Sequence, residues 1–204
     1  MNNYECWEIK GGLLEYFDDT HTYVYNGVIL PSITQILHTK FKDMYTGISK
    51  EVLNRAAQLG STMHKQIEDY EQQGIISDSK ECRNYIFLKK HYKWVCKANE
   101  RPIVLFYQGR PIAAGRLDMI LEKDGRLFIG DLKRTSVLYK EYVTLQTNLY
   151  RIGYQECYGE TIEGLCVIHL REDKRKFVEL PINEKMALEV IEEFLKGEKN
   201  EPST

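Results

Sequence analysis

The chain has 204 residues, 43% of them hydrophobic and 28% charged, with a net charge of −2. This length and composition favour one soluble domain with a sizeable core. There is no apolar run of about 18 residues, the length a membrane-spanning helix needs. The start of the chain also lacks the basic and apolar regions of a secretory signal, so we expect a cytoplasmic protein with no membrane association.

The predicted elements describe a mixed sheet flanked by helices. In chain order they are a β-rich segment at 23–30, helices near 32–45, 49–73 and 78–98, strands near 103–108, 112–122 and 126–134, a helix at 139–157, strands near 164–171 and 175–181, and a helix at 184–196. We expect a single domain over 1–204. Its parts are an N-terminal strand and helices to about 100, a catalytic core at 101–182, and a C-terminal helix and tail at 183–204.

A strong hairpin signal lies at Asp124-Gly125, between two apolar-rich runs. A type I′ turn needs positive φ at both central positions, which Asp-Gly supplies. With this turn, Lys123 faces Arg126, and counting outward along the two strands sets Asp118 directly opposite Asp131. A slip of one residue would undo that pairing.

Alternation along these strands predicts one charged face and one apolar face. The charged face would hold Arg116, Asp118 and Ile120 on one strand and Ile129, Asp131 and Lys133 on the other. The opposite face would be apolar and would form the core.

The paired aspartates predict a metal site. Opposed side chains on neighbouring strands lie about 5 Å apart, and at an effective dielectric of about 20 two carboxylates there repel by roughly 3 kcal/mol. A divalent cation would offset this cost, and carboxylates suit Mg²⁺ or Mn²⁺. Lys133 could then activate water or offset phosphate charge. The alternative is an exposed hairpin face with solvated charges.

Two helices add candidate polar residues. In the helix at 139–157, Gln146 and Tyr150 lie one turn apart beside an apolar stripe. In the helix at 49–73, His64 lies at the edge of the buried face, and Gly60 one turn earlier permits close approach of another backbone or a substrate. The alternative is that Gln146, Tyr150 and His64 are ordinary packed or boundary residues.

These motifs together resemble one nuclease family. Gly115-x-x-Asp118, Asp131-x-Lys133 and Gln146-x-x-x-Tyr150 follow in the order of the PD-(D/E)xK nuclease superfamily, in its RecB-like, phage lambda-type exonuclease branch. The Gly60-Ser61-Thr62-Met63-His64 segment is similar to the Gly-Thr-x-x-His element of that branch. The resemblance spans about 21–182 and implies a mixed α/β (α+β) fold with a restriction-endonuclease-like core and a helical N-terminal elaboration.

The resemblance also implies roles for individual residues. The metal would be bound by His64, Asp118, Asp131 and the backbone carbonyl of Leu132; Lys133 would be the catalytic lysine, and Gln146 and Tyr150 would orient the lysine, water or phosphate. Arg116 and Arg134 are candidates to contact DNA phosphates. Two features depart from the family pattern: Leu117 stands where the family name has proline, and the further glutamate of many relatives has only Glu68 as a candidate.

The resulting prediction is a metal-dependent DNA exonuclease that hydrolyses phosphodiester bonds, in phage or bacterial DNA recombination or repair. It would use Mg²⁺ or Mn²⁺, and no iron–sulfur cluster, because the five cysteines lack the tight C-terminal group that some relatives use. Expected partners are linear DNA with free ends, a recombination or single-strand-annealing protein, and further copies in a homo-oligomer.

Three alternatives stay open. The chain could bind DNA ends or a recombination partner without cutting, it could be an endonuclease or flap nuclease that uses the same residues, or it could be an interaction protein whose acids are only surface charge.

Overall fold

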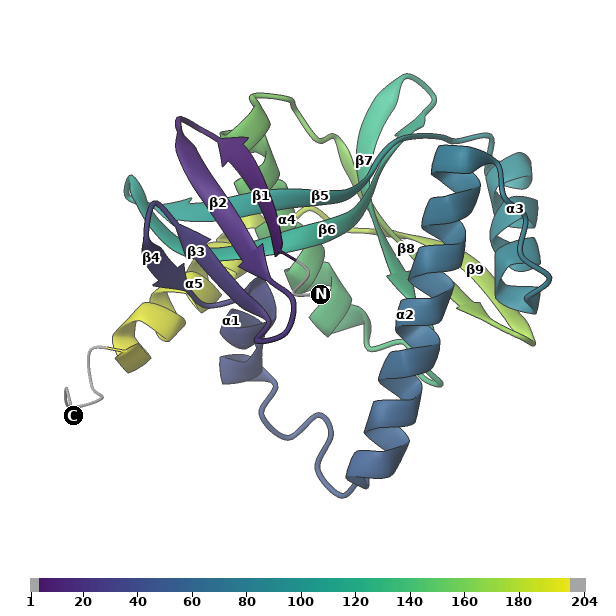
Figure 1. The fold of residues 1–204 in the computed structure, drawn as a ribbon, viewed down its shortest axis with the longest axis horizontal. Helices are drawn as coiled ribbons and strands as arrows, with labels where there is room; N and C mark the ends of the chain where they lie inside the picture. The colour runs from purple at the N-terminus through teal and green to yellow at the C-terminus, as the bar shows by residue number, and fades with distance from the viewer. Residues whose placement is uncertain (1–3, 199–204) are drawn as a thin grey trace.

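The computed structural model describes residues 4–198, which form a mixed α/β fold with two sheets and five helices (Figure 1). The N-terminal sheet is antiparallel, in the order β1 (Tyr4–Ile9), β2 (Gly12–Phe17), β3 (Thr22–Tyr25) and β4 (Val28–Leu30). The larger sheet has the order β5 (Val95–Tyr107), β6 (Arg110–Lys123), β7 (Arg126–Lys133), β8 (Gly164–Arg171) and β9 (Lys174–Leu180). The helices are α1 (Ile33–Lys40), α2 (Lys50–Gln73), α3 (Lys80–Tyr92), α4 (Lys140–Tyr158) and α5 (Glu184–Glu198).

Local signals explain where the helices begin and end. The side chains of Ser32, Ser49 and Ser79 each accept a backbone N–H in the first turn of α1, α2 and α3, as N-cap serines do. Gly74 and Gly159 end α2 and α4 in the left-handed conformation, where glycine has no steric penalty. Within residues 4–198, none of the helices combines the length and apolarity required to cross a membrane.

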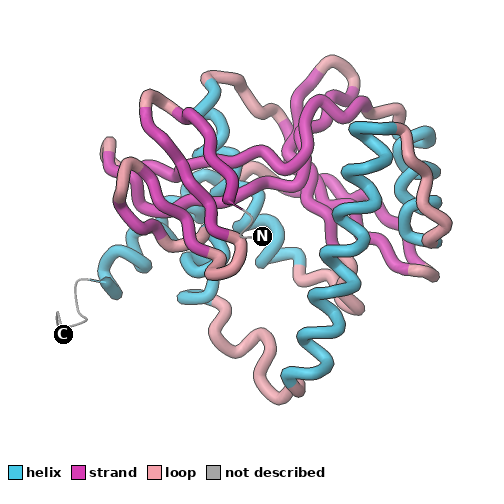
Figure 2. The backbone as a smooth tube through the Cα atoms, in the orientation of Figure 1, coloured by secondary structure: helices cyan, strands magenta, loops and turns pink. Residues whose placement is uncertain are grey.

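Helices cover both faces of the larger sheet (Figures 1 and 2). Strands β7 and β8 are its parallel pair, and such a pair needs a long crossover, here α4, which lies on one face. Ile120 and Ile129 belong to the core on that side together with residues of α1, α4 and α5. Met119 and Phe128 belong to the core on the other side, under α2 and α3. The prediction that only the opposite face of the β6–β7 pair would form core is therefore wrong, because the face that carries Arg116, Asp118 and Lys133 also buries Ile120 and Ile129 under α4.

The predicted hairpin is confirmed. Asp124 and Gly125 both have positive φ, 53° and 74°, and Lys123 pairs with Arg126. The register continues as counted from the turn, and its last pair is Met119 with Gly130.

Helix α2 sets the shape of the molecule around the site. It has 24 residues, of which only Met63 and Ile67 are buried. The helix therefore packs on the body through its C-terminal half, while its N-terminal half projects from the body (Figure 1). His64 lies where the projecting half meets the packed half.

Two sequence-based boundaries are wrong. The predicted helix at 78–98 ends at Tyr92, because Lys93 takes the left-handed conformation and β5 begins at Val95. The β-rich segment predicted at 23–30 begins at Tyr4 instead: residues 4–30 form a four-stranded sheet, whose buried face packs on Val104 and Ala114 of the larger sheet, while α1, α2 and α3 make the rest of the N-terminal part largely helical. Of the predicted tail, 199–204 lies outside the described residues.

Candidate metal centre

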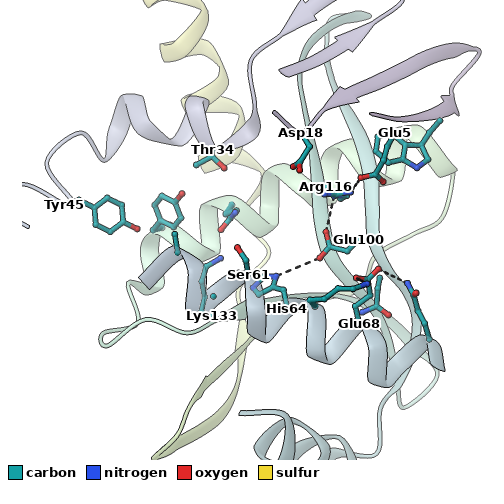
Figure 3. Close-up of a pocket in the computed structure, with 18 residues that line it drawn as sticks. Glu5, Asp18, Thr34, Tyr45, Ser61, His64, Glu68, Glu100, Arg116 and Lys133 are labelled. Carbon is teal, nitrogen blue, oxygen red and sulfur yellow. Dashed lines mark hydrogen bonds and ion pairs between the residues drawn. The ribbon is translucent and has the colours of Figure 1, made fainter. Parts of the chain in front are cut away.

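A cleft of about 1090 Å³ lies between α2, the larger sheet and the N-terminal sheet (Figure 3). Its wall includes Glu5 and Trp7 from β1, His64 and Lys65 from α2, Lys133 at the end of β7 and Gln146 from α4. Segments far apart in the sequence thus contribute side chains to one space. Four of the predicted site residues line it: His64, Arg116, Lys133 and Gln146.

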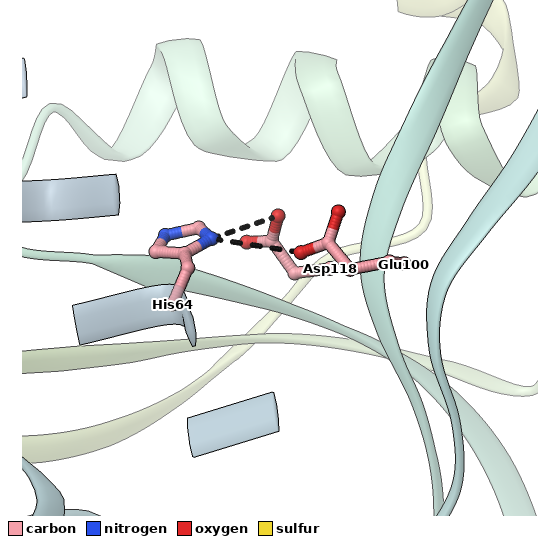
Figure 4. Close-up of side chains that lie close together, drawn as sticks. All are labelled: His64, Glu100 and Asp118. Atoms are coloured by element: carbon pink, nitrogen blue, oxygen red, sulfur yellow. Dashed lines mark ion pairs between the residues drawn. The ribbon is translucent and has the colours of Figure 1, made fainter. Parts of the chain in front are cut away.

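Three potential metal ligands converge at this cleft (Figure 4). One donor atom each from His64, Glu100 and Asp118 lies within 4.8 Å of the other two. His64 Nδ1 is 3.5 Å from Asp118 Oδ1 and 3.9 Å from Glu100 Oε1. These separations suit a ligand set that faces one common point between α2, β5 and β6.

Each of the three side chains is held by a second contact on its other atom. His64 Nε2 is 3.2 Å from the Leu132 carbonyl oxygen. Asp118 Oδ2 accepts the Leu132 backbone N–H at 2.6 Å, and Glu100 Oε2 is 3.1 Å from Arg116 Nε. Such contacts orient ligands before a metal arrives and strengthen its binding.

The electrostatics of His64 match a cation site. Burial is the largest effect and lowers the pKa of His64, but the negative charge of Asp118 and the contact with Glu100 outweigh it and raise that pKa to about 9. A cation is therefore favoured at this point, and a divalent ion would take the place of the imidazole proton. The donor set of one imidazole nitrogen and two carboxylate oxygens fits Mn²⁺ well and is less typical of Mg²⁺.

Asp131 and Lys133 form a buried pair beside this group. Lys133 Nζ donates to Asp131 Oδ1 at 2.8 Å, and Asp131 is only 3% exposed. Burial raises the pKa of Asp131 to about 6, although the charge of Lys133 opposes the rise. Asp131 Oδ2 lies 2.8 Å from the same nitrogen but makes no hydrogen bond of good geometry with the described residues. Asp131 is not in the three-residue group, and both of its carboxylate oxygens lie 2.8 Å from Lys133 Nζ.

Gln146 on α4 lines the cleft, whereas Tyr150, one turn later, lies in the hydrophobic core beside it. Gln146 is buried, and its Oε1 finds no hydrogen-bond donor among the described residues. Burial, and then the charge of Asp118, raise the pKa of Tyr150 well above its usual value, so its hydroxyl stays protonated near the acids. Tyr142, one turn before Gln146, lines the same cleft. The i, i+4, i+8 spacing of Tyr142, Gln146 and Tyr150 was the signal that sequence reasoning missed.

The two predicted aspartates are arranged differently from the expected pair. The β6–β7 ladder ends at Met119 and Gly130, one pair before them. Beyond that pair, the N–H of Leu132 donates to the Asp118 side chain and not to a backbone carbonyl of β6. The Leu132 carbonyl, predicted as a metal ligand, lies against His64.

The two arginines predicted to contact DNA are in ion pairs within the protein. Arg116 Nη1 lies 2.8 Å from Glu5 Oε1, and its Nε faces Glu100. Arg134 Nε lies 2.7 Å from Glu81 Oε1, and both side chains are largely buried. Neither guanidinium is a free surface cation, so contact of either with DNA stays a prediction.

Glu100 is a third potential ligand that the sequence analysis did not name. The strand register sets it opposite Asp118, between the pairs Asn99–Met119 and Arg101–Leu117. Glu68, the earlier candidate, lies in the cleft wall but is engaged by Lys65 at 3.1 Å and by Gln72 at 3.0 Å.

Glu100 also has a strained backbone, with a φ of 49°. Non-glycine residues seldom adopt this conformation, and such residues concentrate at functional sites. This backbone strain is a second, independent feature that distinguishes Glu100 from the other acids of the cleft.

Comparison with known proteins gives a distant structural likeness. No family model matches the chain, and no curated protein matches it. The crystal structure of SSO0001 is similar, with 15% identity over 81% of this chain and 74% of that chain and a TM-score of 0.47. A likeness of this degree supports no statement about function.

Proposed function

We propose that this protein is a metal-dependent deoxyribonuclease, and specifically an exonuclease that acts on linear DNA. One observation carries the proposal: a preorganised His64–Glu100–Asp118 ligand group lies in the same cleft as Lys133 and Gln146. A restriction-endonuclease-like core is the fold we propose with it. Its support is the antiparallel β5–β6–β7 unit followed by a helical crossover to the parallel strand β8.

The residues present fit a divalent cation, with His64, Glu100 and Asp118 as its protein ligands and Asp131 Oδ2 as an additional donor. When bound, such an ion would supply Lewis-acid stabilisation of the charge that develops on a phosphate. Lys133 Nζ would hold a proton and a positive charge beside the phosphate, and Asp131 would keep that lysine in place. Gln146 Oε1, which has no donor among the described residues, would accept a hydrogen bond from the attacking water and orient it.

The test is a nuclease assay on end-labelled linear DNA and on circular DNA, with Mn²⁺ or Mg²⁺. We expect linear DNA to be degraded from its ends, no reaction in EDTA, and at least about a 100-fold loss of rate in Lys133→Met, the scale of losing a proton-transfer or charge-stabilising group. Glu8→Gln, a change on the exposed β1 surface, is the control and should keep full activity.

The other outcomes separate the alternatives. Cutting of circular DNA would show an endonuclease. DNA binding with no metal-dependent turnover would contradict catalysis and favour an end-binding protein. Full activity of a correctly folded Lys133→Met variant would contradict the assignment of the site.

A further inference from the structure

Arg116 connects the N-terminal sheet to the candidate metal ligands. It lies on β6, and its Nη1 is 2.8 Å from Glu5 of β1 while its Nε is 3.1 Å from Glu100 of β5. Its guanidinium carbon also lies 5.2 Å from the ring centroid of Tyr16 on β2, within the range of a cation–π interaction. Figure 3 shows both ion pairs at the rim of the cleft.

The contacts divide the two oxygens of Glu100 between two neighbours. Oε2 is taken by Arg116, which leaves Oε1 to face His64 Nδ1. Asp118 has the same arrangement, with the Leu132 N–H on Oδ2 and His64 near Oδ1. A backbone group orients one carboxylate and the arginine orients the other.

We infer that Arg116 is a positioning residue for the metal centre and that Glu5 of the N-terminal sheet holds it in place. Lysine could not replace it, because one ammonium group on a flexible stem cannot present two N–H groups in the fixed geometry of a guanidinium. The N-terminal sheet is then part of the metal site, although it supplies none of the three candidate ligands. This inference rests on the proposed metal site.

A positioning role for Arg116 and a DNA-contacting role predict different metal affinities for the protein in the absence of DNA. An arginine that only contacts phosphate would affect DNA affinity and leave metal affinity unchanged. An arginine that orients Glu100 affects metal affinity with no DNA present. Residues that orient ligands typically change metal affinity by about 10- to 100-fold.

The experiment is calorimetric titration of the full chain with Mn²⁺ in the absence of DNA. Arg116→Gln and Arg116→Lys should each weaken Mn²⁺ binding about 10-fold or more, and Glu5→Gln should weaken it by a smaller factor. Glu8→Gln lies on the same strand without a contact to Arg116 and should match wild type. Circular dichroism confirms that each variant is folded, and Glu5→Gln provides the test if changes at Arg116 prevent folding.

Three results decide between the claims. Weakened binding in both Arg116 variants and in Glu5→Gln supports the inference. Binding within twofold of wild type in folded Arg116→Gln, or in Glu5→Gln if that variant alone folds, would overturn it. If the wild-type protein itself binds no Mn²⁺, the proposed metal site fails, and the positioning role fails with it.

Discussion

At the scale of single residues, the Asp131–Lys133 pair is the most consequential contact of the cleft. Asp131 is 3% exposed and its carboxylate depends on Lys133 for its counter-charge. Removing one partner of a buried ion pair leaves an uncompensated charge and costs about 3–5 kcal/mol. Lys133 keeps 20% of its side-chain exposure, so water reduces the cost here.

We therefore predict that Lys133→Met lowers the free energy of unfolding by about 2–3 kcal/mol. Adding Asp131→Asn should recover at least half of this loss, because the lone buried carboxylate is then gone. Urea unfolding in EDTA measures both variants. A double variant no more stable than Lys133→Met would show that lost packing, and not the unpaired charge, sets the cost.

At the scale of elements, the junction between α3 and β5 shows how one residue changes a boundary. The helical pattern of the sequence continues to about residue 98, but Lys93 adopts a φ of 57° and its N–H bonds the Lys89 carbonyl. The chain then turns, buries Trp94 and enters β5 at Val95. Glu100 consequently lies in a strand opposite Asp118, where it reaches His64.

Lys93→Gly is predicted to stabilise the protein by about 0.5–1 kcal/mol, because glycine adopts the left-handed C-terminal position of a helix without steric cost. Lys90→Gly, inside the last turn of α3, should destabilise it by about 1 kcal/mol. Thermal or urea unfolding of the two variants makes the comparison, and a loss of stability in Lys93→Gly would contradict the left-handed cap.

Strand register decided which residues of the site could be predicted from the sequence. The Asp124-Gly125 turn fixed the β6–β7 register, so Asp118, Asp131 and Lys133 could be placed together from the sequence. Glu100 could not. The turn between β5 and β6 is Gln108-Gly109, and the ladder beyond it contains an irregularity near Leu105, where the pairing skips Ile112. A straight count from this turn would set Asn99, and not Glu100, opposite Asp118. An extra residue in a strand leaves little trace in alternation.

The ion pairs of Arg116 and Arg134 were equally beyond the sequence. Each joins residues more than 50 positions apart, Arg116 with Glu5 and Arg134 with Glu81. Sequence patterns reveal charges on an element, but only the packing of distant elements shows which charges meet. The sequence therefore suggested that both arginines were available to DNA phosphates, whereas the structure pairs each of them with a carboxylate.

At the scale of the whole molecule, the cleft is acidic and its cations are already paired. Glu5, Glu68 and Glu100 line it, while Lys65 and Arg116 each bind two of the protein's own carboxylates. A phosphate backbone would be repelled by such a surface unless a divalent ion were present. The function we propose therefore depends on metal binding before it depends on any contact with DNA.

The most direct test of this account is calorimetric titration of Mn²⁺ into wild-type protein, Glu100→Gln and Glu68→Gln. Both variants remove one negative charge from the same cleft, but only Glu100 faces His64 and Asp118. We predict that Glu100→Gln weakens Mn²⁺ binding at least about 10-fold, the loss seen even for groups that only orient a ligand, while Glu68→Gln binds like wild type. Equal affinity of Glu100→Gln and wild type would contradict the assignment of the metal centre.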